Sequence, residues 1–412
     1  MSIKGIIIKT VLGLLAVAIL AGSIYQLLKP ADDSAEEYID VYSADAEKVV
    51  EVEIKGEDSY TLVKTGEEWV MEGVEGVKVN KTFADTLVKS LCNIQSPMKV
   101  DTFGVKLADY GLEEPLVTAT LDFGGKKKSI SVGNPSGEYY YLKADSDVYL
   151  VSAPDLYMVM LDKIKYLDDT VLSMYADSVT SLSYNGIVLE KGENGWAMTA
   201  PYKMQADNDK VKAMLEEMSD IVAEEIVKKD EVTDGEPVSV ALVLGDMVIA
   251  FDVNGSYILF EHAEYAYKVA ESELAFLTVS AFDLVQKYVA PIAINEVKSV
   301  KFTSNEGVID FTIDSPDSDA PVFYKNGVEV TDVLFRDFYQ KLMSLTFTRE
   351  GAVSGVVEYS IAFTKTDDSV YMVQFLPISE SEYAVDINGV KNFVVNKKNV
   401  KDIFEAAKNL KV

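Results

Sequence analysis

The segment EYAVDINGVKNFVVN, residues 382–396, holds two strand-like runs on either side of Asn388-Gly389. Asn-Gly between β-branched and aromatic residues is the strongest short-range hairpin signal, so two antiparallel strands joined by a tight turn are predicted. The same pattern recurs in YYYLKADSDVYLV (residues 139–151) and YILFEHAEYAYKV (residues 257–269). In each copy a second aromatic residue follows the first tyrosine by ten positions, and a valine follows two positions later. This repetition predicts three tandem copies of one structural unit.

The beginnings of the three copies also correspond. Residues 48–54, 178–184 and 296–302 alternate apolar and polar side chains, which predicts a half-buried strand in each copy. A second strand, an aromatic position and an amphipathic helix follow in the same order, and a helix is expected again after each hairpin. The aromatic positions are Trp69, Trp196 and Phe323, and the expected helix caps are Asn80, Asp207 or Asn208, and Thr331.

The first thirty residues differ from the rest of the chain. Thr10 to Leu28 is an uncharged, mostly apolar run of 19 residues, preceded by Lys4 and Lys9 and followed by several acidic residues. This length and charge asymmetry predict a transmembrane anchor with a cytoplasmic N-terminus and the bulk of the chain outside. The alternative is a cleaved signal peptide, for which residues 18–21 provide a small-residue cleavage site. No cysteine follows the run, which excludes a lipoprotein anchor.

Together these patterns predict an α+β protein, in which an N-terminal transmembrane helix precedes three tandem repeated α+β units with mainly antiparallel sheets. The predicted boundaries are residues 1–30 for the cytoplasmic tip and anchor, 31–44 for a linker, 45–172 for the first unit, 173–291 for the second and 292–412 for the third.

Composition excludes several functional classes. The 412 residues include 38 Lys and Arg against 67 Asp and Glu, a net charge of −29, and such a surface repels nucleic acid. One cysteine and one histidine exclude a disulfide framework, a Cys-rich metal site and a multi-His metal centre. The sequence offers no catalytic residues, no cofactor-binding residues and no metal ligands, and we expect a protein that is not an enzyme.

A few side chains are candidates for contact or chemistry. Tyr139, Tyr140 and Tyr141 are consecutive on one predicted strand, so at least one points outward, and they form a candidate interaction surface. The alternative is a hairpin covered by a neighbouring unit. His262 is expected in an exposed hairpin turn, and Cys92 is expected to be an inert thiol at the end of a helix.

One stretch resembles a known family. Asp109-Tyr110-Gly111-Leu112-Glu113-Glu114-Pro115 lies downstream of the Trp69 strand and precedes an alternating strand, the segment 130–134 and the tyrosine hairpin. In this order it resembles the DUF4340 family over about residues 45–170, and partially over 178–290. The resemblance implies a bacterial envelope protein with an N-terminal membrane segment and repeated α+β units. It further implies a partner of ABC-type export systems, including the gliding-motility kind, without assigned catalytic residues.

The favoured function is therefore a single-pass, extracytoplasmic accessory or scaffold protein. It would be held in the membrane by residues 10–28 and would partner an envelope protein such as an ABC permease. Two alternatives remain. The first is an envelope module that binds a ligand or polymer through its outward tyrosines, and the second is a hydrolase that uses carboxylates alone.

Overall fold

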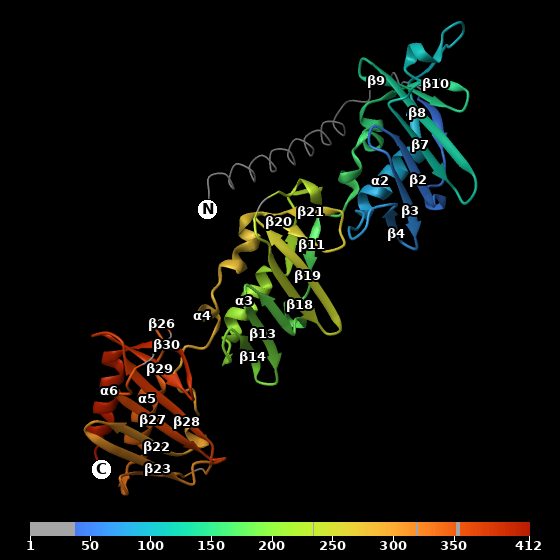
Figure 1. Cartoon of the computed structure of the whole chain (residues 1–412). Helices are drawn as coiled ribbons and strands as arrows, with labels where there is room; N and C mark the ends of the chain where they lie inside the picture. The colour runs from blue at the N-terminus through green and yellow to red at the C-terminus, as the bar shows by residue number, and fades with distance from the viewer. Residues whose placement is uncertain (1–37, 234, 319, 352–354) are drawn as a thin grey trace, which may run out of the picture. The chain divides into compact units, whose positions relative to one another are not determined.

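The computed structural model describes residues 38–233, 235–318, 320–351 and 355–412 (Figure 1). It divides into two compact units, one ending at Asp168 and the other running from Asp169 to Val412. The transmembrane helix expected at residues 10–28 lies outside the described residues. Within the part of the chain that is described, no helix is long and apolar enough to cross a membrane.

The predicted α+β class is wrong, because the chain is mostly antiparallel β-sheet, with 45% of residues in strands and 23% in helices. The prediction overestimated the helices that follow the hairpins. In the first copy, extended backbone at Leu161 and Asp162 divides this segment into 3-10 turns of three or four residues. Only the third copy closes with a long α-helix, α6 (Lys397–Asn409). The closing segments of the other copies are η3 (Pro154–Leu156), η4 (Met158–Met160), η5 (Lys163–Tyr166), η8 (Glu271–Thr278) and the short α4 (Ala281–Leu284).

The first unit is built on an eight-stranded antiparallel sheet. The first three strands of this sheet run from its centre to one edge, and helix α2 (Lys81–Cys92) follows them. The next strand of this sheet forms its opposite edge. A meander of four antiparallel strands then lies between that edge strand and the central strand. A separate strand pair, β1 (Ile39–Ser43) with β5 (Asn93–Ser96), joins the start of the unit to the end of α2. The strands in sheet order are β4 (Glu68–Met71), β3 (Tyr60–Thr65), β2 (Glu51–Gly56), β7 (Val117–Asp122), β8 (Lys127–Ser136), β9 (Tyr139–Ala144), β10 (Asp147–Ser152) and β6 (Met98–Val100).

The second sheet follows the same path with nine strands, and α3 (Asn208–Glu217) takes the place of α2. Its leading pair is β11 (Thr170–Ser173) with β16 (Asp220–Val222). The strands in sheet order are β15 (Met204–Gln205), β14 (Gly195–Ala200), β13 (Ile187–Gly192), β12 (Ser181–Tyr184), β18 (Val238–Leu244), β19 (Met247–Asn254), β20 (Tyr257–Leu259), β21 (Tyr265–Lys268) and β17 (Glu225–Lys228).

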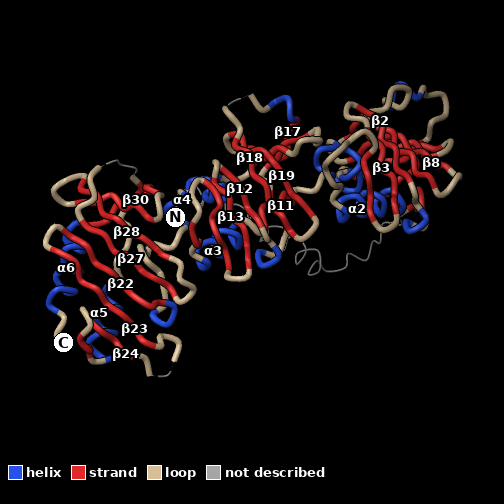
Figure 2. The backbone as a smooth tube through the Cα atoms, turned by 60° about the horizontal axis from the view of Figure 1, so that its bottom comes forward, coloured by secondary structure: helices blue, strands red, loops and turns tan. Residues whose placement is uncertain are grey.

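The third sheet repeats this order with nine strands and lies in the same compact unit as the second. Helices α5 (Asp332–Met343) and α6 pack side by side against it (Figure 2). The strands in sheet order are β25 (Val328–Val330), β24 (Val322–Lys325), β23 (Gly307–Asp314), β22 (Val297–Ser304), β27 (Tyr359–Lys365), β28 (Val370–Pro377), β29 (Glu382–Ile387), β30 (Val390–Asn396) and β26 (Arg349–Glu350).

An equivalent aromatic contact joins the first hairpin to the closing segment in all three sheets. In each, a ring from the first hairpin meets a ring from the closing segment at a centroid distance of 5.1–5.9 Å. Such pairs add to the free energy of burial when the rings are tilted or edge-on. The contact joins segments about a hundred residues apart, so it ties the start of each sheet to its end. The pairs are Tyr60 with Tyr166, Tyr184 with Phe276, and Phe302 with Phe404.

Each sheet buries one face against its helices and leaves the other largely open. On β22, Val300 and Phe302 are buried, and Phe302 touches Phe338 of α5 as well as α6. The intervening residues of β22, Ser299 and Lys301, point to the opposite face and remain accessible. This alternation is typical of antiparallel sheets with one solvated face.

Candidate functional site

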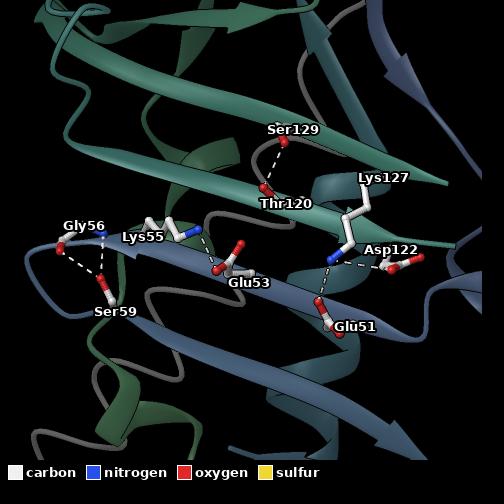
Figure 3. A network of polar contacts seen from close by, with 9 residues as sticks. All are labelled: Glu51, Glu53, Lys55, Gly56, Ser59, Thr120, Asp122, Lys127 and Ser129. Carbon is white, nitrogen blue, oxygen red and sulfur yellow. Dashed lines mark hydrogen bonds and ion pairs between the residues drawn. The ribbon is translucent and has the colours of Figure 1, made fainter. Parts of the chain in front are cut away.

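The open face of the first sheet carries a network of polar contacts across β2, β7 and β8 (Figure 3). Lys127 Nζ lies 3.1 Å from Glu51 Oε1 and 3.6 Å from Asp122 Oδ2. The pKa of Lys127 is raised by its bond to Glu51 and then by Asp122, so the group stays cationic and contacts both acids. Thr120 and Ser129 share a hydroxyl hydrogen bond of 2.8 Å beside it. This arrangement presents a polar surface suited to contact with another macromolecule.

The three candidate tyrosines lie on β9 and are all half-buried. Tyr139 is paired with Ser152, and Tyr140 with Val151, on the neighbouring strand β10. Tyr141 packs against the ring of Tyr110 with a centroid distance of 4.7 Å. The three side chains therefore do not form one exposed aromatic stripe, and Tyr141 belongs to a small cluster that covers the open face at this end of the sheet.

That cluster is built by the Tyr110-Gly111-Leu112 element. Tyr110 and Leu112 are buried together with Val148 of β10, and Val100 packs against them. Gly111 ends the short helix η2 (Leu107–Tyr110) with a φ of +66°, a conformation that favours glycine. The aromatic residue, the left-handed glycine and Leu112 thus fix the connection from β6 to β7 across the sheet.

At this point the backbone around Gly111 and the backbone of strand β8 approach each other closely. A Cβ added to Gly111 would lie 2.4 Å from Asn134 Oδ1 and 2.8 Å from the Asn134 backbone nitrogen. A Cβ added to Gly133 would lie 2.2 Å from the carbonyl oxygen of Tyr110. Only glycine at these two positions lets the backbone of η2 approach strand β8 so closely.

Directly before this element, the chain exposes apolar side chains on the segment from Met98 to Leu107. It comprises β6, the loop that follows and the first residue of η2, and we call it loop 98–107. Phe103 is 94% exposed, and Met98, Val105 and Leu107 are 49%, 42% and 37% exposed. The sequence analysis missed this surface. The available signal was the run Phe103-Gly-Val-Lys-Leu107, whose apolar residues have neither strand alternation nor a helical stripe.

The one cysteine and the one histidine of the chain are not part of these surfaces. Cys92 is buried at the end of α2, and burial, then Asp45, raise the pKa of its thiol to about 11. His262 is exposed in the turn between β20 and β21, as the sequence predicts. In the described ranges, no group of three or more His, Cys, Asp or Glu side chains could hold a metal ion.

A cleft of about 400 Å³ lies between α6 and the hairpin formed by β22 and β23. Its apolar wall includes Tyr359 and Phe404. At its rim, Lys408 Nζ pairs with Glu306 Oε2 at 2.8 Å, and Lys401 also lines the opening. An apolar wall with a few charged groups is the usual composition of a small-ligand site.

The resemblance seen in the sequence is confirmed. A family model described as "Domain of unknown function (DUF4340)" matches residues 69–239, which extend from β4 of the first sheet to β18 of the second. No curated protein matches the chain. Residues 69–239 of the chain thus match the DUF4340 family, whose function is unknown.

Proposed function

We propose that the chain is a non-catalytic accessory or scaffold protein that contacts a membrane protein of an ABC-type transport system. The observation that carries this proposal is the open sheet face that recurs in all three sheets. On the first sheet, this face holds ion pairs and hydroxyl pairs, such as Lys127 with Glu51. Surfaces of this composition suit polar protein interfaces, in which exposed ion pairs add specificity more than affinity.

The proposed location is the outer face of the cytoplasmic membrane. Its support is the apolar run at residues 10–28, with lysines before it and acidic residues after it. Membrane fractionation followed by protease treatment of intact spheroplasts tests the location. We expect the chain in the membrane fraction, with residues 38–412 digested from outside.

The proposed partnership is tested by crosslinking the full chain in its native cells, followed by affinity capture under denaturing conditions. We expect an ABC permease or its ATPase among the crosslinked proteins. A tagged envelope protein of similar abundance serves as the control for non-specific capture. Recovery of transport components at no more than the control level would contradict the proposed partnership.

The cleft beside α6 favours a second candidate function, the binding of an envelope ligand or polymer. Cosedimentation of the full chain with isolated cell-wall polymer measures this activity. If the cleft is the binding site, Lys401→Glu lowers the bound fraction, while the exposed Lys301→Glu on the opposite face of the third sheet leaves it unchanged. Equal losses in the two variants would exclude the cleft as the binding site.

A further inference from the structure

The backbone conformation of loop 98–107 is fixed by several hydrogen bonds. The amide of Phe103 donates to Asp101 Oδ1 at 3.0 Å, and the amide of Val105 donates to the carbonyl of Thr102 at 3.2 Å. The amide of Lys106 donates to Asp109 Oδ2 at 3.2 Å. At its base, the loop continues into the buried Tyr110 cluster. The apolar side chains are therefore presented in a defined arrangement.

The fold does not require apolar residues at this place. The equivalent connection of the second sheet, between β17 and β18, contains Lys229-Asp230-Glu231 and later Glu236 in place of an apolar run. Both connections leave the edge strand that follows the helix and lead to the centre of the sheet. Because Phe103 is 94% exposed, it adds nothing to the core of the first unit. Exposed apolar groups clustered in this way are typical of interaction sites.

The charges around the loop indicate what kind of partner fits. Four exposed acids, which we call its rim, lie in loop 98–107 or in the residues that follow it up to Glu114. Lys99 is already paired with Asp147 at 2.7 Å, and Lys106 is the remaining cation of the segment. The rim is therefore acidic, as is the chain as a whole with its net charge of −29. An anionic lipid surface would be repelled by such a rim. The four acids are Asp101, Asp109, Glu113 and Glu114.

We propose that loop 98–107 is a docking element that inserts Phe103 into an apolar pocket bordered by Lys or Arg on a partner protein. This inference rests on the proposed contact function and assigns its principal contact to one loop of the first unit. Aromatic side chains in the middle of an interface usually contribute most of its binding free energy, and the acidic rim guides the encounter with a basic partner.

The test compares capture of the crosslinked transport component by variants of the full chain. Phe103→Asp lowers the captured amount about tenfold, as expected when a central aromatic contact is lost. Glu113→Lys combined with Glu114→Lys also lowers it, because the rim then repels a basic partner. The matched control is Val248→Asp in the second sheet, whose side chain is 62% exposed, and it leaves capture unchanged. Circular dichroism melts verify that all variants remain folded.

A photoreactive p-benzoylphenylalanine in place of Phe103 separates the two proposals. If the wild-type chain captures a transport component but Phe103→Asp captures it equally well, the docking proposal is overturned and the contact function stands. If no transport component is captured, the proposed partnership fails. The docking proposal then survives only if two results are obtained. Position 103 must crosslink to a protein segment flanked by Lys or Arg, and the charge reversal Glu113→Lys with Glu114→Lys must reduce the amount of that adduct. Adducts to lipid, adducts to a second copy of the chain, or no adduct overturn it.

Discussion

Replacing Gly111 by Ala tests the tight chain crossing between η2 and β8. The substitution adds one methyl group at a residue with a φ of +66°. It places that methyl 2.8 Å from the backbone nitrogen of Asn134, which lies in the bulge of β8 between Val132 and Pro135 and cannot rotate away as a side chain could. We expect Gly111→Ala to destabilise the first unit without changing its fold.

Two effects contribute to the size of this loss. An L-residue in the left-handed region costs roughly 1–2 kcal/mol. Overpacking against a fixed backbone adds about 1–3 kcal/mol. The sum is about 3 kcal/mol of unfolding free energy. Gly137→Ala is the matched control, because Gly137 has nearly the same φ of +65° but nothing within 4 Å of an added Cβ. It should cost only about 1 kcal/mol, since the conformational cost acts alone.

The two tryptophans of the chain make the measurement specific, because Trp69 lies in the first unit and Trp196 in the second. In a Trp196→Phe background, urea unfolding followed by fluorescence reports the first unit through Trp69, which is buried and hydrogen-bonded to Asp85. The free energy of unfolding is then compared between Gly111→Ala and Gly137→Ala. Equal losses for the two variants would refute the argument from close approach and leave only the cost of the backbone conformation.

Other predictions follow from single side chains. Asp85→Ala removes the acceptor of Trp69 and should lower the unfolding free energy of the first unit by about 1–2 kcal/mol at pH 7. Burial opposes the charge of Asp85, but the bonds from Trp69 and Lys81 lower its pKa. The charge-dependent part of the loss should therefore persist above about pH 4 and disappear in more acidic urea titrations, where the neutral carboxyl still accepts the bond from Trp69. Cys92 should react with iodoacetamide at pH 8 far more slowly in the native chain than in urea, and equal rates would show that the thiol is not buried. Phe404→Ala should cost about 3 kcal/mol through the cavity it leaves beside Phe302, measured as faster hydrogen exchange in β22 and β23, and unchanged exchange there would contradict this role.

The local parts of the fold were predictable because short segments determine them. At Asn388-Gly389, both residues have positive φ, and Asp386 accepts a hydrogen bond from the amide of Gly389 at 2.7 Å, so the hairpin signal reflects real turn geometry. Two of the expected caps also act as such, since the side chains of Asn80 and Asp207 accept bonds from the first turns of α2 and α3. Thr331 precedes α5 but makes no such bond.

The long-range parts were not predictable from local patterns. The pairing of β2 with β7 joins Glu51 to Asp122 across most of the first unit, and no periodicity in either strand specifies the other. The same holds at the candidate site. Tyr141 looks exposed in its own strand, and only the return of Tyr110 from a distant loop covers it. Phe103 is exposed on the segment that leads to the turn at Gly111, and the sequence shows that turn without showing what the turn packs against.

The strand order has a practical consequence for work on this family region. A fragment cut at residues 69–239 would lack β2 and β3. It would therefore leave β4 without its neighbour β3, and β7 with one unpaired edge. At its other end it would keep only Val238 and Ser239 of β18 and would lose β19, β20 and β21. Unpaired edges of this kind favour aggregation. The piece that spans residues 38–168 contains the complete first sheet together with β1 and the closing segment, so truncations intended for crystallisation or binding assays should end there and not at the limits of the family match.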